Sequence, residues 1–175
     1  MNSDTAGEKL LMTNAANEYD GSCLTLHGEA FKLSSGEPFY FGAKIKSSRA
    51  DADFVLGMCE TLTAYMEAAA HTVIGTALEG AFFFVGTTAA VKAQVYKDNA
   101  QSSTADAASV LDTSAHIYEI YWDGTYVNFY YDGTLVTSTA TTLPDGALTP
   151  VLHFRNGSGN ATTCTVSWMR AIQIN

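Results

Sequence analysis

The pattern of apolar and polar positions is clearest between residues 117 and 136, where two Asp-Gly-Thr turns separate three apolar runs. Asp-Gly readily adopts the positive φ angles of tight hairpin turns, and the turns begin at Asp123 and Asp132. Around the first turn, the residues alternate with the two-residue period of a strand. One face would hold Tyr118, Ile120 and Trp122 from one strand and Val127, Phe129 and Tyr131 from the next. The segment therefore predicts a three-stranded antiparallel meander with a filled inner face.

Short apolar runs between turn residues continue along the rest of the chain. We expect strands within residues 22–33, 39–46, 54–59, 80–86, 90–96, 151–155 and 164–174, and loops at 47–53 and 98–112. Residues 62–70 form the one stretch with helical propensity, and we expect this insertion at one end of the fold. About ten to twelve short strands predict an all-β fold, an antiparallel β-sandwich or jelly roll.

The last strand carries an irregularity. Its apolar positions of one parity are Cys164, Val166, Trp168, Ile172 and Ile174. Arg170 interrupts this row, which predicts a strand end or a β-bulge. Cys164 is expected to act as a small core hydrophobe.

Composition limits the classes of function. The 175 residues suit one domain, which we divide into a polar N-terminal arm (1–20) and a single sandwich domain (21–175). The net charge is −9, and an acidic protein is unsuited to nucleic acid, because phosphate binding needs clustered Lys and Arg. The densest basic group is Lys44, Lys46 and Arg49, which we interpret as a solvated strand edge, with contact to an acidic partner as the alternative.

Nothing in the sequence predicts a membrane segment, a metal site or a cofactor. No apolar run approaches the ~20 residues of a membrane span, and the absence of a secretory signal favours folding in a cytoplasm. The cysteines Cys23, Cys59 and Cys164 lack the spacing of a zinc site or a disulfide framework. The histidines also lack metal-ligand spacing; they are His27, His71, His116 and His153.

Three segments resemble the concanavalin A-like (laminarinase/laminin-G-type) jelly-roll family. They are residues 36–46 with 52–58, the meander, and residues 148–174, which together span about residues 22–175. Within this superfamily the chain is similar to tailed-bacteriophage virion proteins, which share Gly-Glu-Pro-Phe-Tyr-Phe and Ala-Asp-Phe-Val-Leu-Gly near the start and Leu-Thr-Pro…Arg-Asn-Gly near the end. The resemblance implies a capsid decoration (cement) protein, made in the host cytoplasm and placed on the capsid exterior.

The resemblance also implies which catalytic residues a glycan hydrolase of this superfamily would need. Such an enzyme carries two carboxylates on one strand, in a Glu-x-Asp-x-Glu or Glu-x-Asp-x-x-Glu motif, and none of the glutamates here forms it. Asp51 and Asp53 fall in a predicted loop and are interpreted as a solvated turn, with a calcium pair or an acid/base pair as the alternatives. We therefore expect no catalytic residues and a protein that is not an enzyme.

Two function hypotheses follow. In the preferred one, the arm residues Leu10, Leu11, Met12 and Tyr19 help to bind the major capsid protein, and the chain is a homo-oligomer, such as a trimer, that stabilises the shell. In the alternative, the chain is a lectin-like module that binds a host glycan. Tyr121, Tyr126 and Tyr130 have the parity opposite to the predicted core and could form a strip for sugar stacking, or could lie in a subunit interface.

Overall fold

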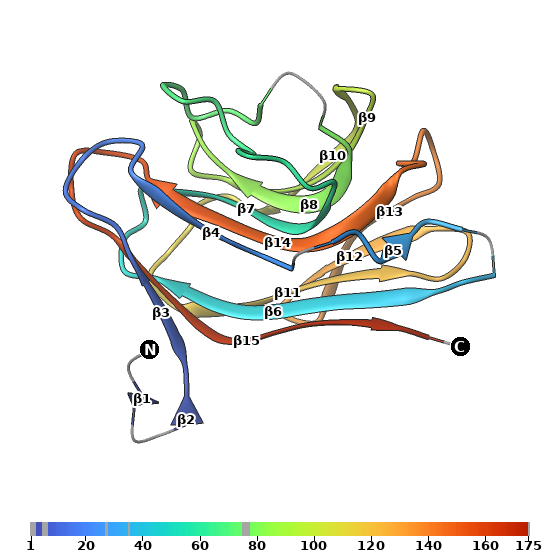
Figure 1. Cartoon of the computed structure of the whole chain (residues 1–175), viewed down its shortest axis with the longest axis horizontal. Helices are drawn as coiled ribbons and strands as arrows, with labels where there is room; N and C mark the ends of the chain where they lie inside the picture. The colour runs from blue at the N-terminus through green and yellow to red at the C-terminus, as the bar shows by residue number, and fades with distance from the viewer. Residues whose placement is uncertain (1–2, 5–6, 27, 35, 75–77, 175) are drawn as a thin grey trace.

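Two antiparallel β-sheets stack face to face. The computed structural model describes residues 3–4, 7–26, 28–34, 36–74 and 78–174 of the chain. All regular secondary structure in these ranges is β-strand, so the predicted all-β sandwich is confirmed (Figure 1). The described part of the chain contains no helix that is long and apolar enough to cross a membrane.

The first sheet has seven strands and is the more strongly curved in Figure 1. Its main path runs β10 (Ala100–Ala108), β9 (Val91–Lys97), β8 (Gly80–Val85), β7 (Ala52–Cys59), β14 (Ala147–Asn156) and β4 (Gly21–Thr25). The short strand β5 (Phe31–Lys32) also pairs with β14. Separately from the two large sheets, β1 (Ser3–Asp4) and β2 (Gly7–Glu8) pair with each other outside the sandwich (Figure 1).

The second sheet has six strands and contains the predicted meander. Its order is β13 (Thr134–Thr139), β12 (Val127–Tyr131), β11 (Ala115–Trp122), β6 (Phe39–Ser47), β15 (Thr163–Gln173) and β3 (Leu10–Thr13). The antiparallel pairing of β11 with β12 and of β12 with β13 confirms the meander. The core lies between the two sheets, where Phe83 packs edge-to-face on Tyr118 at 5.2 Å and on Phe129 at 5.5 Å between ring centroids. Cys164 is fully buried there, as predicted.

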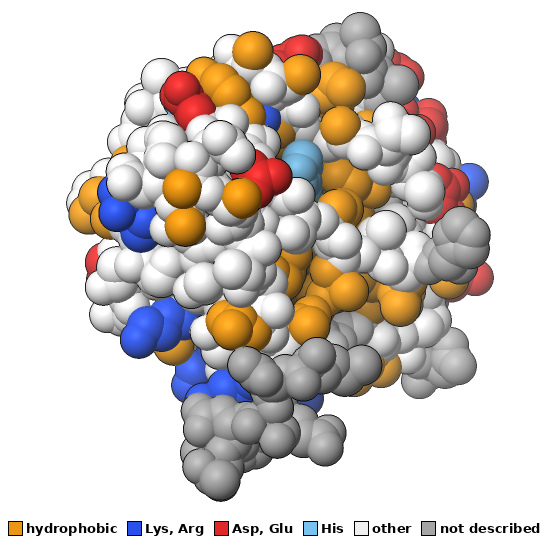
Figure 2. All heavy atoms as spheres, turned by 60° about the vertical axis from the view of Figure 1, so that its left-hand side comes forward, with side chains coloured by type: hydrophobic (Ala, Val, Ile, Leu, Met, Phe, Trp, Pro, Cys, Tyr) orange, Lys and Arg blue, Asp and Glu red, His pale blue; other side chains and the backbone are white. Residues whose placement is uncertain are grey.

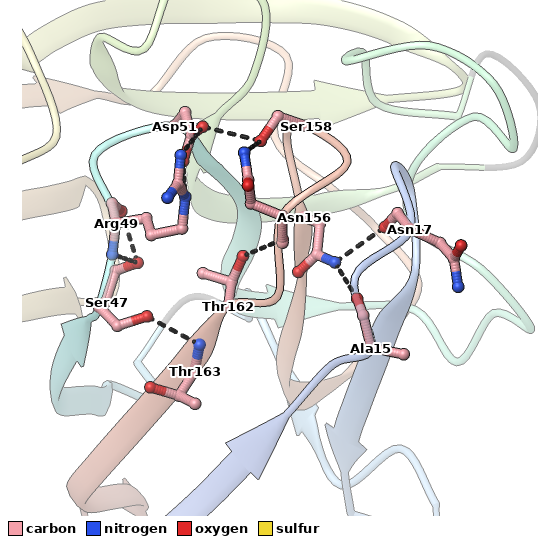
Figure 3. Close-up of polar contacts among 11 residues, drawn as sticks. Ala15, Asn17, Ser47, Arg49, Asp51, Asn156, Ser158, Thr162 and Thr163 are labelled. Atoms are coloured by element: carbon pink, nitrogen blue, oxygen red, sulfur yellow. Dashed lines mark hydrogen bonds and ion pairs between the residues drawn. The ribbon is translucent and has the colours of Figure 1, made fainter.

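The N-terminal segment differs from the predicted arm from residue 10 onward. Strand β3 pairs with β15, and Met12 is buried in the core. The turn after β3 is fastened to the end of β14, since the Asn156 side-chain amide donates to the carbonyl oxygens of Ala15 (2.5 Å) and Asn17 (2.8 Å) (Figure 3). Because Met12 packs in the core, its side chain is not on the surface for a partner to bind.

Two secondary-structure predictions are wrong. The predicted loop at 98–112 contains β10, whose small and polar residues have weak strand propensity but pair along most of β9. The predicted helical stretch at 62–70 is irregular, with one bridge between Met66 and Val73. Tyr65 and Met66 are buried against the seven-stranded sheet, and burial of these side chains outweighs the helical propensity of the neighbouring alanines. The insertion therefore lies across a sheet face rather than at one end of the sandwich.

The predicted bulge in the last strand is present, but it lies before Arg170. Val166 pairs with Ile45 and Trp168 with Lys44, so the register shifts between Val166 and Trp168. Because the extra residue reverses the alternation, Trp168 and Ile172 do not share the core face of Cys164 as predicted. They lie on the outer face of the sheet with Arg170.

Candidate functional site

The outer face of the seven-stranded sheet carries a second, smaller hydrophobic cluster. Val55 of β7, Phe82 of β8 and Val151 of β14 point away from the main core and are buried beneath Tyr65 and Met66. The covering segment is the green connection between β7 and β8, which lies above these strands in Figure 1. It covers the middle of the sheet.

A cleft of about 220 Å³ lies beside this cover, toward β9. Three elements line it: the covering segment, the β8–β9 hairpin with its turn, and β10. The lining residues are His71, Thr72, Val73, Phe84, Thr87, Thr88, Lys92, Gln94, Tyr96 and Gln101. Apolar surface and hydrogen-bonding groups are therefore mixed within a small volume.

The amide of Gln94 is the most unusual polar group in the cleft. Gln94 is 5% exposed, and its Nε2 donates to Oε1 of Gln101 at 3.1 Å. Its own Oε1 is buried and has no hydrogen-bond donor among the described residues. A buried oxygen without a donor costs about 1–3 kcal/mol, so Gln94 would be stabilised if its side chain turned to present this oxygen to a ligand hydroxyl in the cleft.

Tyr96 adds an aromatic ring to the cleft. It stacks on Phe82 with ring centroids 5.5 Å apart and an interplanar angle of 30°. Burial raises the pKa of the Tyr96 phenol above its ordinary value, so the hydroxyl keeps its proton near neutral pH and remains a donor. On the same strand, Lys92 Nζ lies 2.9 Å from Asp106 Oδ1.

A buried ion pair between Asp53 and Arg155 holds the covering segment at the edge of the cleft. Asp53 and Arg155 are each 2% exposed, and Arg155 Nε donates to Asp53 Oδ2 at 3.2 Å. The Arg155 guanidinium also donates to the carbonyl oxygens of Glu67 (2.5 Å) and Ala70. Asp53 Oδ2 lies 2.7 Å from Nδ1 of His71. Burial raises the pKa of Asp53, and the neighbouring His71 and Arg155 partly offset this.

The N-terminal turn reaches the same histidine. Glu18 Oε1 lies 3.4 Å from His71 Nε2, and the Tyr19 ring lies 5.0 Å from the imidazole ring. The Arg155 guanidinium also lies over the Tyr19 ring, with its carbon 5.1 Å from the ring centroid. Tyr19, a predicted capsid-binding residue, thus lies beside His71 in the structure.

The interpretation of Asp51 and Asp53 as a solvated turn is wrong for Asp53. Asp51 lies at the turn and pairs with Arg49 and Ser158 (Figure 3), but Asp53 is inside β7 and buried. Its parity with Val55 was a usable signal. Its partners could not be found in the sequence, because Arg155 becomes its neighbour only through the β7–β14 pairing.

The tyrosines predicted for glycan contact lie elsewhere. Tyr121 and Tyr130 are half-buried on the outer face of the six-stranded sheet, on the opposite side of the sandwich from the cleft, and Tyr126 is exposed beside the β11–β12 turn. Of the arm residues, Leu10 is half-buried and Leu11 is exposed on β3.

The remaining histidines do not join the cleft. His116 lies between Asp112 (2.9 Å) and Asp132 (2.6 Å), and His153 packs beside Tyr65 at 6.1 Å between ring centroids. His27 lies outside the described residues. Across the described ranges, no group of three or more His, Cys, Asp or Glu side chains is placed to hold a metal ion.

Comparison with solved structures shows the concanavalin-like jelly-roll fold. The carbohydrate recognition domain of Emp47p matches with a TM-score of 0.70 and 11% identity, over 95% of this chain and 83% of that one. The alginate lyase AlyC3 matches with a TM-score of 0.66 and 10% identity, over 99% and 78%. A prokaryotic lichenase from a mouse hindgut metagenome matches with a TM-score of 0.66 and 14% identity, over 95% and 81%. No protein-family model and no curated protein matches the chain.

These likenesses confirm the predicted fold and correct one functional prediction. The neighbours include carbohydrate-recognition domains and enzymes that act on glycans, and the enzymes contradict the prediction that the chain is not an enzyme. The missing glucanase motif addressed one reaction only, whereas the fold also occurs in a lyase. The narrower resemblance to phage virion proteins is not shown by any comparison.

Proposed function

We propose that the chain binds a carbohydrate in the cleft beside β9. The observation that carries this proposal is the Gln94 amide in the wall of the cleft, whose Oε1 meets no donor among the described residues; the cleft also presents Tyr96, Thr87 and Thr88. Sugars offer many hydroxyl donors on a ring with apolar faces. A few placed polar groups beside an aromatic ring suit that chemistry.

The size of the cleft limits the ligand. At about 220 Å³ it is smaller than the roughly 300–1,000 Å³ typical of sites for drug-sized molecules. One sugar unit, either free or as part of a longer chain, is the expected occupant. The fold supports this class of ligand, because the carbohydrate recognition domain of Emp47p has the same architecture.

A glycan array probed with the intact chain tests the proposal, followed by calorimetric titration of the best glycan. Gln94→Ala should weaken binding by about tenfold, the cost of one buried hydrogen bond. Gln173→Ala is the matched control, since Gln173 is an exposed glutamine on β15. Absence of any glycan signal, or equal affinity of the Gln94→Ala variant, would contradict the proposal.

Catalysis on a bound glycan is a second candidate, favoured by the contact between Asp53 and His71. A buried carboxylate on Nδ1 fixes the orientation and tautomer of an imidazole, which is how histidines are prepared for proton transfer. Release of reducing ends or of unsaturated sugars from polysaccharides should then require His71. His71→Gln should abolish product formation, while glycan affinity should fall only modestly, as for the loss of one residue that lines the cleft. Product formed at the same rate by this variant would exclude the role.

A capsid decoration role remains a separate proposal from the resemblance. In it, the major capsid protein is the partner, the chain is a homo-oligomer, and the location is the capsid exterior. The hairpin β1–β2, which lies outside the sandwich in Figure 1, offers a contact element for such a partner. Purified chain should bind mature capsids and raise their melting temperature; unchanged capsids would contradict this role.

A further inference from the structure

A row of basic residues lies on the outer face of the six-stranded sheet, opposite the cleft. Lys44 and Lys46 alternate along β6 with the buried residues Ala43 and Ile45, so both point outward. Arg170 of β15 pairs with Gly42 and continues this line by one two-residue step. Successive positions are therefore about 6.6 Å apart along the strand direction. We refer to Lys44, Lys46 and Arg170 as the basic stripe.

The basic stripe is offset only in part by the protein itself, through Glu119, which lies on the other side of Gly42 from Arg170. Four other basic side chains have acidic partners within 4 Å: Arg49 with Asp51 (2.8 Å), Lys92 with Asp106 (2.9 Å), Lys97 with Asp145 (2.6 Å) and Arg155 with Asp53 (3.2 Å). No ion pair is found for the three stripe residues within the described ranges, although the chain carries a net charge of −9. An excess of positive charge on one face of an acidic protein is a site of attraction for anions.

Figure 2 agrees with this separation of charge. Lys and Arg side chains gather toward the lower left of the face shown, on the side of the six-stranded sheet, while most Asp and Glu side chains lie higher or to the right. Glu119 also belongs to the outer face of this sheet, and its Oε1 accepts a hydrogen bond from the Tyr40 hydroxyl at 2.7 Å.

Aromatic rings accompany the stripe. The Arg170 guanidinium carbon lies 5.2 Å from the Tyr40 ring centroid and 4.9 Å from the Trp168 ring centroid. Tyr40 can lie across the sheet because its neighbour is Gly42, where a Cβ atom would be 2.2 Å from the Tyr40 hydroxyl. Beside these rings, a groove of about 380 Å³ is lined by Tyr40, Tyr121, Arg170, Ile172 and Ile174.

We propose that the basic stripe binds an anionic polysaccharide, one whose sugar units carry carboxylate or sulfate groups. The evenly spaced cations pair with the acid groups, while Trp168 and the groove beside Tyr121 contact the sugar rings. Nucleic acid fits this face less well, because a tight complex neutralises more phosphates than three cations can and the net charge of −9 opposes it. The site is independent of the cleft, since it lies on the other sheet.

The experiment measures affinity of the intact chain for polygalacturonate, with neutral dextran as the reference polymer, at about 50 mM and about 500 mM salt. We expect binding to polygalacturonate but not to neutral dextran, and weaker binding at high salt. Replacing all three residues (Lys44→Gln, Lys46→Gln, Arg170→Gln) should weaken it by about tenfold or more, the sum of three exposed ion pairs. Sulfated dextran, tested in parallel, distinguishes sulfate from carboxylate as the preferred group.

Matched controls separate the outcomes. Lys44→Gln should weaken binding more than Lys32→Gln, which removes the same charge from β5, an exposed position elsewhere. Gln94→Ala should leave polygalacturonate binding unchanged, so failure of the cleft proposal is distinguishable from failure here. The proposal is overturned by equal binding of dextran, by equal effects of Lys44→Gln and Lys32→Gln, or by duplex DNA binding as tightly as polygalacturonate.

Discussion

Asp53 and Arg155 face each other across strands β7 and β14, nearly excluded from solvent, with Arg155 Nε donating to Asp53 Oδ2 at 3.2 Å. The other guanidinium nitrogens of Arg155 donate to the carbonyl oxygens of Glu67 and Ala70, in the segment that covers the outer sheet face. The pair therefore connects the sheet, the covering segment and His71. A buried pair of this kind matters most when one partner is removed, because the other charge is left without compensation.

Arg155→Met should lower the free energy of unfolding by about 3–5 kcal/mol, since it leaves the buried Asp53 carboxylate with His71 alone and removes the donors that hold the covering segment. Urea denaturation measures this loss. The matched control is Arg49→Met, because Arg49 and Asp51 form a partly exposed pair whose loss should cost no more than about 1 kcal/mol. Similar losses for the two variants would show that the Asp53–Arg155 contact is not a structural anchor.

His153 should make the fold less stable in acid. Burial, followed by the charge of Arg155, lowers the pKa of His153 to about 4, from an unfolded value near 6.5. The unfolded chain therefore binds the proton first, and this contribution to stability, complete above about pH 6.5, is lost as pH falls toward 4, by at most about 3 kcal/mol. His153→Gln should flatten that part of the curve of unfolding free energy against pH; an unchanged slope would contradict the assignment.

His116 should act in the opposite direction. Burial alone would lower its pKa, but hydrogen bonds to Asp132 and Asp112 outweigh burial, so the folded pKa is raised. Its stabilising contribution is complete below pH ~6.5 and is lost as pH rises through the folded pKa. His116→Gln should destabilise the protein by about 1 kcal/mol at pH 5 and by less at pH 8. A cost that grows with pH would exclude the charged form.

Gly57 should be essential for pairing of β7 with β8. A Cβ atom there would lie 2.5 Å from the Ala81 carbonyl oxygen and 2.6 Å from the Phe82 Cα, and these backbone atoms cannot move aside. Gly57→Ala should cost about 1–3 kcal/mol or more, the usual range for overpacking. Gly159→Ala is the control, because no atom lies within 4 Å of its Cβ position. Thermal melting compares the two, and equal melting temperatures would refute the steric argument.

Local sequence was sufficient for the elements whose signal is local. The meander could be predicted because Asp123 and Asp132 introduce turns between strands of clear alternation, and the structure pairs these strands as expected. The sandwich architecture followed from the number of such elements. By contrast, residues 62–70 have an intrinsic preference that the outer face of the distant β7 and β8 overrides.

The candidate sites were harder to predict, for two physical reasons. One is that an extra residue reverses every later side chain in a strand, which moved Trp168 from the predicted core to the outer face. The other is that the cleft joins residues from separate elements. Gln94 and Gln101 are near in sequence, but His71 reaches the site through Asp53, and that contact depends on the covering segment.

Carbohydrate binding in the cleft is tested most directly by backbone NMR of the intact chain during titration with a glycan selected on the array. The expected result is a set of saturable amide shifts centred on Thr87, Gln94 and Tyr96, which disappears in the Gln94→Ala variant. Shifts confined to β6 and β15, or a glycan-induced pattern unchanged by Gln94→Ala, would contradict binding in the cleft.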